Sequence, residues 1–272
     1  MVHDLTEIAL AALHLAERRS DMTACDSQNH GPDIRAQLLE LYTRLANEPD
    51  SDFGWGRGKD NARALGYPED WLNRLPDGVW ESAAAVGNPF SLGPIRAGET
   101  IVDIGCGAGA DACVAALLVG GKGKVAGIDC TPAMIDKAAS NAAVSGFSQI
   151  VYHEAEMAAL PLLGASADVV ISNGAINLGE SKTAVLGEIF RVLRPGGRLQ
   201  IADMVRDPSQ GRAVSCNSEE SWADCVSGTL EPDVFISMLT QAGFVQVELT
   251  GFTGYKTAPA TTGALIRAVK PR

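Results

Sequence analysis

Apolar residues in the first part of the chain recur every three or four positions, with polar or glycine-rich stretches between them. This spacing predicts helices over residues 2–19 and 34–46. Residues 47–66 are polar and contain several glycines, which predicts a loop, and a short helix is expected after Pro68. We therefore expect residues 1–97 to form a helical and looped N-terminal extension.

The pattern changes after residue 97, where short β-rich runs begin to alternate with helical segments. Parallel sheets that are covered by helices on both faces have this alternation. The predicted fold class is α/β, with a doubly wound, mostly parallel, seven-stranded sheet that has an antiparallel edge. We expect this domain to span residues 98–272, with a polar insertion or lid near residues 206–231. The strands are expected at residues 99–104, 124–129, 150–153, 168–172, 198–203, 245–249 and 263–269, and the helices at residues 111–119, 132–145, 182–193 and 232–242.

The first of these strands ends in the turn Asp103-Ile104-Gly105-Cys106-Gly107-Ala108-Gly109. Glycines let a backbone approach a ligand closely and adopt positive φ without a Cβ clash. In doubly wound sheets, ligands bind beyond the carboxyl ends of the strands, where the strand order reverses. Asp129 ends the second strand, and a carboxylate there can accept both hydroxyls of a ribose. The turn and Asp129 together predict a site for a nucleotide-like ligand.

The glycine spacing distinguishes two classes of such ligand. A pyrophosphate binder usually carries G-x-G-x-x-G at the start of a helix. Here Gly105, Gly107 and Gly109 stand at alternate positions and follow Asp103. S-adenosylmethionine has no phosphate, but it has an ammonium group that suits an acid beside the turn. A dinucleotide-dependent oxidoreductase is therefore the less favoured hypothesis.

Two later features complete a series that resembles the class I methyltransferase family, which has a Rossmann-like fold. Asn173 follows the fourth strand, and Pro195-Gly196-Gly197 precedes the fifth. The resemblance covers about residues 98–203 and implies S-adenosyl-L-methionine as the cofactor. It places the methionine and ribose portions on the glycine turn, the adenine near the second and third strands, and Asn173 near the acceptor. The implied cofactor-binding residues are Asp103, Gly105, Cys106, Gly107, Gly109, Asp129, Cys130, Glu156, Met157 and Asn173.

Two of these residues have simpler interpretations. Asp129 would be a solvated strand end if no ribose bound there, although its position in the unit favours the binding role. Met157 would be ordinary core packing, which is the more usual role of a methionine in such a fold.

The resemblance extends beyond the common fold to the bacterial and archaeal arsenite methyltransferases, over roughly residues 65–249. In that family, cysteine thiolates hold trivalent arsenic, because arsenic is soft and thiophilic. The arsenic lone pair then attacks the sulfonium methyl group in line, and the protein mainly supplies positioning. The stretches that carry this resemblance are Leu65-Gly66-Tyr67-Pro68-Glu69, Leu75-Pro76-Asp77-Gly78, Val86-Gly87-Asn88-Pro89, Gly127-Ile128-Asp129-Cys130-Thr131-Pro132-Ala133-Met134, Ile171-Ser172-Asn173-Gly174-Ala175-Ile176-Asn177-Leu178 and Cys225-Val226-Ser227-Gly228-Thr229-Leu230.

The resemblance implies three metalloid-binding cysteines, and this chain departs at two of them. Val86 stands at the first position and Gly174 at the second, so only Cys225 remains. One thiolate does not chelate arsenic, and Cys216 or Cys25 would have to compensate. We predict that Val86, Gly174 and Cys225 belong to a substrate site that has become apolar and roomier. Packing beside Trp222 is the simpler interpretation of Cys225. We predict no metal site and name no catalytic residue.

Composition limits the classes of partner that the protein is expected to bind. The net charge of −11 disfavours nucleic acid and anionic membrane surfaces. No apolar run approaches the roughly 18 residues that a membrane span needs. The beginning of the chain lacks the basic start and uncharged apolar stretch of a signal peptide. We therefore expect a cytoplasmic protein with a small-molecule acceptor, and the sequence leaves the oligomeric state open.

The sequence as a whole predicts an S-adenosylmethionine-dependent methyltransferase of arsenite-methyltransferase type, which acts on a metalloid or a small molecule. Residues 1–97 would cover the acceptor site. Two alternatives stay open: methylation of a carbon, oxygen, nitrogen or sulfur atom of an organic acceptor, and a catalytically inactive, cofactor-binding regulatory protein.

Overall fold

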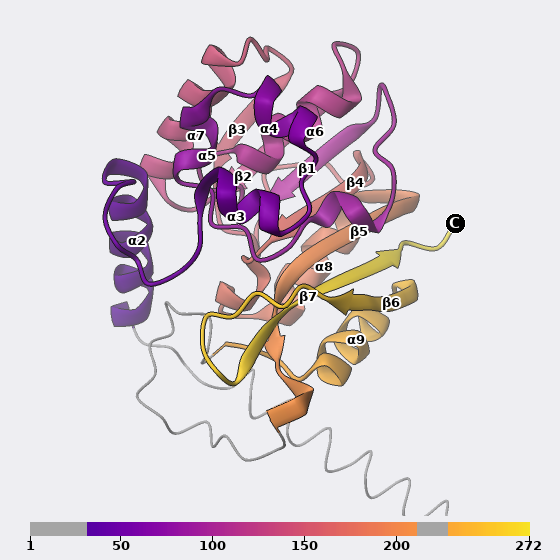
Figure 1. The fold of residues 1–272 in the computed structure, drawn as a ribbon. Coiled ribbons are helices and arrows are strands. Elements are labelled where there is room, and N and C mark those ends of the chain that lie inside the picture. The colour runs from indigo at the N-terminus through magenta and orange to yellow at the C-terminus, as the bar shows by residue number, and fades with distance from the viewer. Residues whose placement is uncertain (1–31, 211–227) are drawn as a thin grey trace, which may run out of the picture.

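A seven-stranded sheet forms the centre of the protein (Figure 1). The computed structural model describes residues 32–210 and 228–272. The strand order is β3-β2-β1-β4-β5-β7-β6, and β7 runs antiparallel to both of its neighbours while the other pairs are parallel. The strands are β1 (Thr100–Ile104), β2 (Lys124–Asp129), β3 (Ile150–Glu154), β4 (Ala167–Asn173), β5 (Leu193–Arg206), β6 (Val245–Phe252) and β7 (Thr261–Val269).

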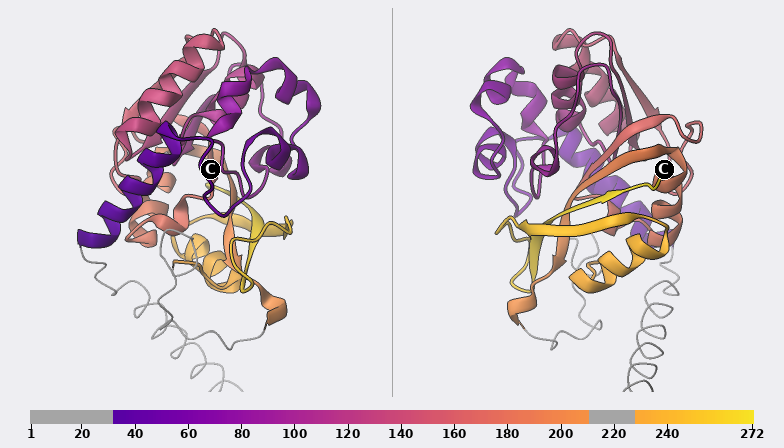
Figure 2. Two further views of the ribbon diagram at one scale, coloured as in Figure 1. Left: turned by 60° about the vertical axis from the view of Figure 1, so that its left-hand side comes forward. Right: turned by 90° about the vertical axis from the view of Figure 1, so that its right-hand side faces the viewer.

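Helices cover both faces of the sheet, and the alternation of side chains along β1 shows how. Val102 and Ile104 pack in one core with helices α8 and α9, whereas Ile101 points to the other face and packs with α6. Asp103 is two residues from Ile101, so its side chain shares the α6 face. The right-hand view of Figure 2 shows α9 lying against β6. These helices are α6 (Ala110–Val119), α7 (Pro132–Val144), α8 (Lys182–Val192) and α9 (Pro232–Gln241).

The described part of the N-terminal extension packs on the α6 face. Trp80 is only 2% exposed and shares a hydrophobic core with α6 and β1. Tyr67 meets the ring of Trp80 edge-on, with 5.8 Å between the ring centroids. Helix α2 stands apart at one side of the molecule and contacts α7 (Figure 1). The elements are α2 (Pro32–Asn47), α3 (Gly58–Ala64), α4 (Glu69–Arg74), α5 (Asp77–Glu81) and the 3-10 turn η1 (Pro89–Leu92).

The α/β prediction with a mostly parallel, seven-stranded sheet is confirmed, and three details differ. Helix α3 lies within the predicted loop at residues 47–66, because Ala62 is buried by tertiary packing that periodicity does not reveal. The edge strand is β6, and the antiparallel strand β7 lies second from the edge, between β5 and β6. The segment Pro195-Gly196-Gly197 is part of β5, which begins at Leu193 and contains a register shift opposite Ala167.

Several sequence predictions fall outside the described residues. They are the helix at residues 2–19, Cys25, Cys216, Cys225 and most of the insertion near residues 206–231. At the described ends of that insertion, Val205 and Leu230 form a parallel bridge. The division near residue 97 stays a prediction. In residues 32–210 and 228–272, no helix is both long and apolar enough to cross a membrane.

Candidate functional site

A cavity of about 510 Å³ opens at the carboxyl ends of β1, β2 and β4. Its position is the switch point of the sheet, where ligands of doubly wound folds bind. Most of the residues predicted to bind the cofactor or the substrate line it, whereas Gly109 and Val86 do not. The predicted residues along its wall are Asp103, Gly105, Cys106, Gly107, Asp129, Cys130, Glu156, Met157, Asn173 and Gly174.

The glycine turn after β1 has a conformation and a packing that exclude side chains. Gly105 has φ +68°, and a Cβ added there would lie 2.2 Å from the Cβ of Ala175. Its backbone N–H donates to the Ile128 carbonyl at 2.8 Å, which ties the turn to β2. Gly109 has φ +82° and begins α6, and its added Cβ would meet the Tyr152 hydroxyl at 2.5 Å. Gly105 therefore shapes the cavity wall, while Gly109 permits close packing behind it.

A buried acidic cluster lies beneath the turn. The Tyr67 hydroxyl donates to Asp111 Oδ1 at 2.7 Å, and Asn173 Nδ2 donates to Asp111 Oδ2 at 2.9 Å. Asp103 is 1% exposed, and its Oδ2 has no hydrogen-bond partner. Burial, followed by the charges of Asp111 and Asp129, raises the pKa of Asp103 well above its usual range. Burial also raises the pKa of Asp111, although its bonds from Asn173 and Tyr67 oppose that rise. Both shifts favour the protonated carboxyl unless a cationic partner binds beside the cluster.

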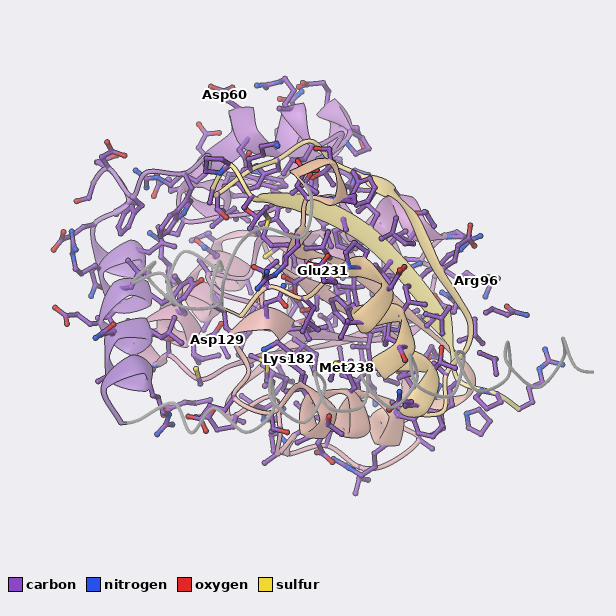
Figure 3. All side chains as sticks on the ribbon, turned by 90° about the horizontal axis from the view of Figure 1, so that it is seen from below. Asp60, Arg96, Asp129, Lys182, Glu231 and Met238 are labelled. Atoms are coloured by element: carbon purple, nitrogen blue, oxygen red, sulfur yellow. The ribbon has the colours of Figure 1, made fainter. Side chains whose placement is uncertain are left out.

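Asp129 is hydrogen-bonded to the glycine turn. Its Oδ2 accepts from the Gly107 N–H at 2.9 Å, and its Oδ1 accepts from the Thr131 N–H at 2.9 Å. A carboxylate has about four lone-pair positions, so acceptor capacity remains for two hydroxyls. Figure 3 shows Asp129 on the side of the sheet that faces α2. Beside it, burial and the Asp129 charge raise the pKa of the Cys130 thiol to about 11, so that thiol is protonated at neutral pH.

The segment after β3 carries Glu156 and Met157. The Glu156 carboxylate forms an ion pair with Arg35 of α2, which the sequence predictions did not include. Met157 lines the cavity and also packs against the core around α8, and its contact with a cofactor stays a prediction.

The segment after β4 is held by a buried carboxylate. Asp203 accepts from the Ile176 N–H at 2.9 Å and from Asn177 Nδ2 at 2.8 Å. Burial raises the pKa of Asp203 to about 6. These bonds fix the 3-10 turn η2 (Ile176–Leu178), so that Gly174 and Ala175 lie against the cavity.

Val86 and Gly174, at which the resemblance implies cysteines, are neighbours. A Cβ added to Gly174 would lie 3.3 Å from Val86 Cγ1. Val86 is buried with Ala202 and Met204 in a small apolar cluster, behind the cavity wall. In the described ranges, no group of three His, Cys, Asp or Glu side chains could hold a metal ion.

Comparison with known proteins decides the family. A family model described as a methyltransferase domain matches residues 95–243, more than half of the chain. The chain belongs to the methyltransferase-domain family.

Relatives within this family show which methyltransferases the chain is similar to. The arsenite methyltransferase of Halobacterium salinarum is 38% identical over 68% of this chain and 47% of that protein. The arsenite methyltransferase of Aquipseudomonas alcaligenes is 32% identical over 56% of this chain and 46% of that protein. The chain therefore spans about half the length of the curated relatives it matches.

A solved structure gives the same relationship. The arsenic(III) S-adenosylmethionine methyltransferase of Chlamydomonas reinhardtii is 28% identical and has a TM-score of 0.56, over 78% of this chain and 72% of that one. The predicted methyltransferase fold, the relationship to arsenite methyltransferases and the S-adenosylmethionine cofactor are confirmed at the level of the family.

Two further segments of the cavity wall are apolar. One face of α2 contributes Leu38, Leu39, Tyr42 and Leu45, and the backbone segment before Val86 contributes three alanines in a row, residues 83–85. That segment is held in place by Asn61 Nδ2, which donates to the Ala85 carbonyl at 2.8 Å. Small side chains here leave room for a ligand rather than filling the cavity.

Three residues of the methyltransferase site escaped the sequence predictions. Tyr67 lies in one of the quoted family stretches, but its role depends on Asp111, 44 positions away. Asp111 was only the expected start of a helix. Arg35 reaches Glu156 across 121 positions, and no local pattern marks that contact.

Replacing Tyr67 with Phe tests the acidic cluster. Asp111 would lose a buried hydrogen bond, and we expect the free energy of unfolding to fall by about 1–3 kcal/mol in urea denaturation. The matched control is Tyr255→Phe, because Tyr255 is less buried and its hydroxyl donates to the Gly56 carbonyl at 3.1 Å. We expect a loss of about 0.5 kcal/mol there. Equal losses in the two variants would mean that Tyr67 has no special role in holding Asp111.

Proposed function

We propose that the protein transfers the methyl group of S-adenosylmethionine to a small molecule held in the apolar part of the same cavity. The observation that carries this proposal is the convergence of the glycine turn, the acidic cluster and Asp129 on a cavity that is also lined by the apolar face of α2 and by three consecutive alanines, residues 83–85. Family membership supports the donor, and the cavity supports a small acceptor.

The residues present fit this cofactor. Asp103, with one carboxylate oxygen unpartnered, would hold the ammonium group, because a buried carboxylate gains most from a cationic partner. Asp129 would accept from the ribose hydroxyls. Gly105 and Gly107 would let the backbone lie against the methionine portion. Cys130, Glu156 and Met157 would then border the adenine.

The bound cofactor supplies an electrophilic methyl group on a sulfonium. Among the described residues that line the cavity there is neither histidine nor lysine. Tyr67 is not a base at neutral pH, because burial raises its pKa well above the usual range and its hydroxyl donates to Asp111. The protein's contribution is therefore to position the acceptor in line with the methyl group and to exclude water, which can lower the barrier by several kcal/mol.

An organic acceptor is the first candidate, because Val86 and Gly174 stand at two of the three positions where the resemblance implies metalloid-binding thiols. A Cβ added at Gly174 would lie 3.3 Å from Val86 Cγ1, so two thiols at these positions would be close together, whereas the residues present offer none. The relationship to arsenite methyltransferases favours a metalloid acceptor as the second candidate. That candidate would need a thiol from outside the described ranges, such as Cys225.

Arsenic speciation separates the two candidates. The full chain is incubated with S-adenosylmethionine, glutathione and arsenite, and the arsenic species are resolved by chromatography with elemental detection. We expect no methylated arsenic from the natural sequence. Methylation that disappears in Cys225→Ser would establish the metalloid acceptor instead, and methylation that survives it would show that arsenic is handled without the family thiol.

Restoring the thiols gives the complementary test. Because a Cβ at position 174 would lie 3.3 Å from Val86 Cγ1, the double variant Val86→Cys/Gly174→Cys is expected to bind arsenite at least about tenfold more tightly than the natural sequence. Each single variant is the matched control and should gain much less, since one thiolate does not chelate. No gain in the double variant would mean that these positions are not the counterparts of the relatives' thiols.

A further inference from the structure

We propose that Arg35 and Glu156 form a latch that closes helix α2 over the cofactor and sets the rate of its exchange. The proposal rests on the proposed function, because it assumes that S-adenosylmethionine occupies the cavity. It adds a positioning residue from a helix that lies outside the matched methyltransferase domain.

The end of α2 is firmly attached to the rest of the protein. Leu45 is 1% exposed and packs with Ala108 and Met134. The Ser82 hydroxyl donates to the Leu45 carbonyl at 2.9 Å, and Lys137 Nζ donates to the Ala46 carbonyl at 2.9 Å. This end of the helix is therefore the anchored one.

The beginning of α2 lies over the part of the cavity proposed for the adenine. Arg35 lines the cavity there and forms its ion pair with Glu156, which follows β3. Both side chains are about half exposed, at 57% and 50%. An exposed ion pair of this kind is weak and screened by salt, unlike the buried contacts at the other end of the helix.

The wall between these two ends belongs to α2. Leu38, Leu39 and Tyr42 line the cavity, so a cofactor seated at the glycine turn would be covered by this helix. Pivoting α2 about its anchored end would require the Arg35 ion pair to break while Leu45 and Ala46 stay in place. A weak latch opposite a strong anchor suits an element that opens at every exchange of cofactor for product.

A latch has a kinetic signature that a ligand contact lacks. It favours the closed state of both the free and the occupied protein, so its removal speeds entry and exit together. A side chain that only contacts the ligand would affect exit alone. The ion pair lies beside the part of the cavity proposed for the adenine, which cofactor and product share, so the effect should be the same for S-adenosylmethionine and S-adenosylhomocysteine.

Stopped-flow fluorescence measures both rates, since Trp80 lines the cavity and would report occupancy. For Arg35→Met, which keeps the apolar stem of the side chain, we expect the association and dissociation rates of S-adenosylmethionine to rise together by about 2- to 5-fold. The Kd should change by less than about twofold, and S-adenosylhomocysteine should behave alike. The matched control is Arg44→Met, because Arg44 of α2 pairs with Glu48 just beyond the end of the helix, and it should leave both rates unchanged.

Raising the salt concentration tests the Arg35–Glu156 ion pair without any substitution. Near 1 M NaCl the screening length falls to about 3 Å, so the rates of the natural sequence should approach those of Arg35→Met. Three results would each overturn the latch. They are a rise in the dissociation rate alone, unchanged rates in Arg35→Met, and a ratio of the rates of Arg35→Met to those of the natural sequence that salt does not reduce. Failure of the natural sequence to bind S-adenosylmethionine at all would overturn the proposed function instead.

Discussion

Asp103→Asn is expected to weaken the binding of S-adenosylmethionine by about 30- to 100-fold, because the variant loses a buried charge-assisted bond to the ammonium group. Among the described residues Asp103 has no cationic partner, and its Oδ2 makes no hydrogen bond there. The measurement is isothermal titration of the full chain. Asp168→Asn is the matched control, since Asp168 pairs with Arg194 and does not line the cavity. Affinity unchanged in Asp103→Asn would show that another group holds the ammonium.

The same substitution should make the unliganded protein more stable. The pKa of Asp103 is raised in the folded state, so the unfolded chain loses this proton at a lower pH than the folded one. Stability contributed by this group is therefore lost as the pH rises above about 3.9, which is the pKa of an aspartate in the unfolded chain. We expect Asp103→Asn to gain about 1–3 kcal/mol at pH 7.5 over the natural sequence, and little near about pH 4, in urea unfolding. A loss of stability at pH 7.5 would mean that Asp103 is compensated in the folded protein.

Gly105→Ala should have the largest effect on folding and on cofactor binding together. The new methyl group would lie 2.2 Å from the Cβ of Ala175, and φ of +68° disfavours any side chain. We expect a loss of about 3–5 kcal/mol in the free energy of unfolding and no detectable binding of S-adenosylmethionine. Gly120→Ala is the matched control, because Gly120 has φ +67° and nothing within 4 Å of its added Cβ. It should lose less, about 1–3 kcal/mol, from backbone strain alone.

A second substitution separates the clash from the backbone strain. Ala175→Gly in the Gly105→Ala background removes the methyl group that is in the way, so its stability should return to about the level of Gly120→Ala. If the double variant recovers nothing, the close approach of Gly105 and Ala175 does not limit this position.

The sequence predicted the parts of the site that lie within one strand–turn–helix unit. The glycine turn and Asp129 are adjacent to their strands, so their place at the switch point follows from the order of the elements. The pairing order of β6 and β7 was not predictable, because alternating apolar residues identify a strand without naming its neighbour. The alanine wall and the Arg35–Glu156 ion pair join segments far apart in the chain. Helical periodicity predicted that α2 exists, but not which surface its apolar face would cover.

The replacement of the family thiols illustrates the same limit. The sequence identified Val86 and Gly174 as departures from the arsenite methyltransferases. Their contact across the sheet edge, and the place of Val86 behind the wall rather than in it, required the tertiary structure.

Equilibrium binding of S-adenosylmethionine to the full chain, with NAD measured in parallel, tests the central claim most directly. We expect one equivalent of S-adenosylmethionine to bind with a Kd of about 1–100 μM, and no NAD binding at such concentrations. Tight binding of NAD without binding of S-adenosylmethionine would contradict the account.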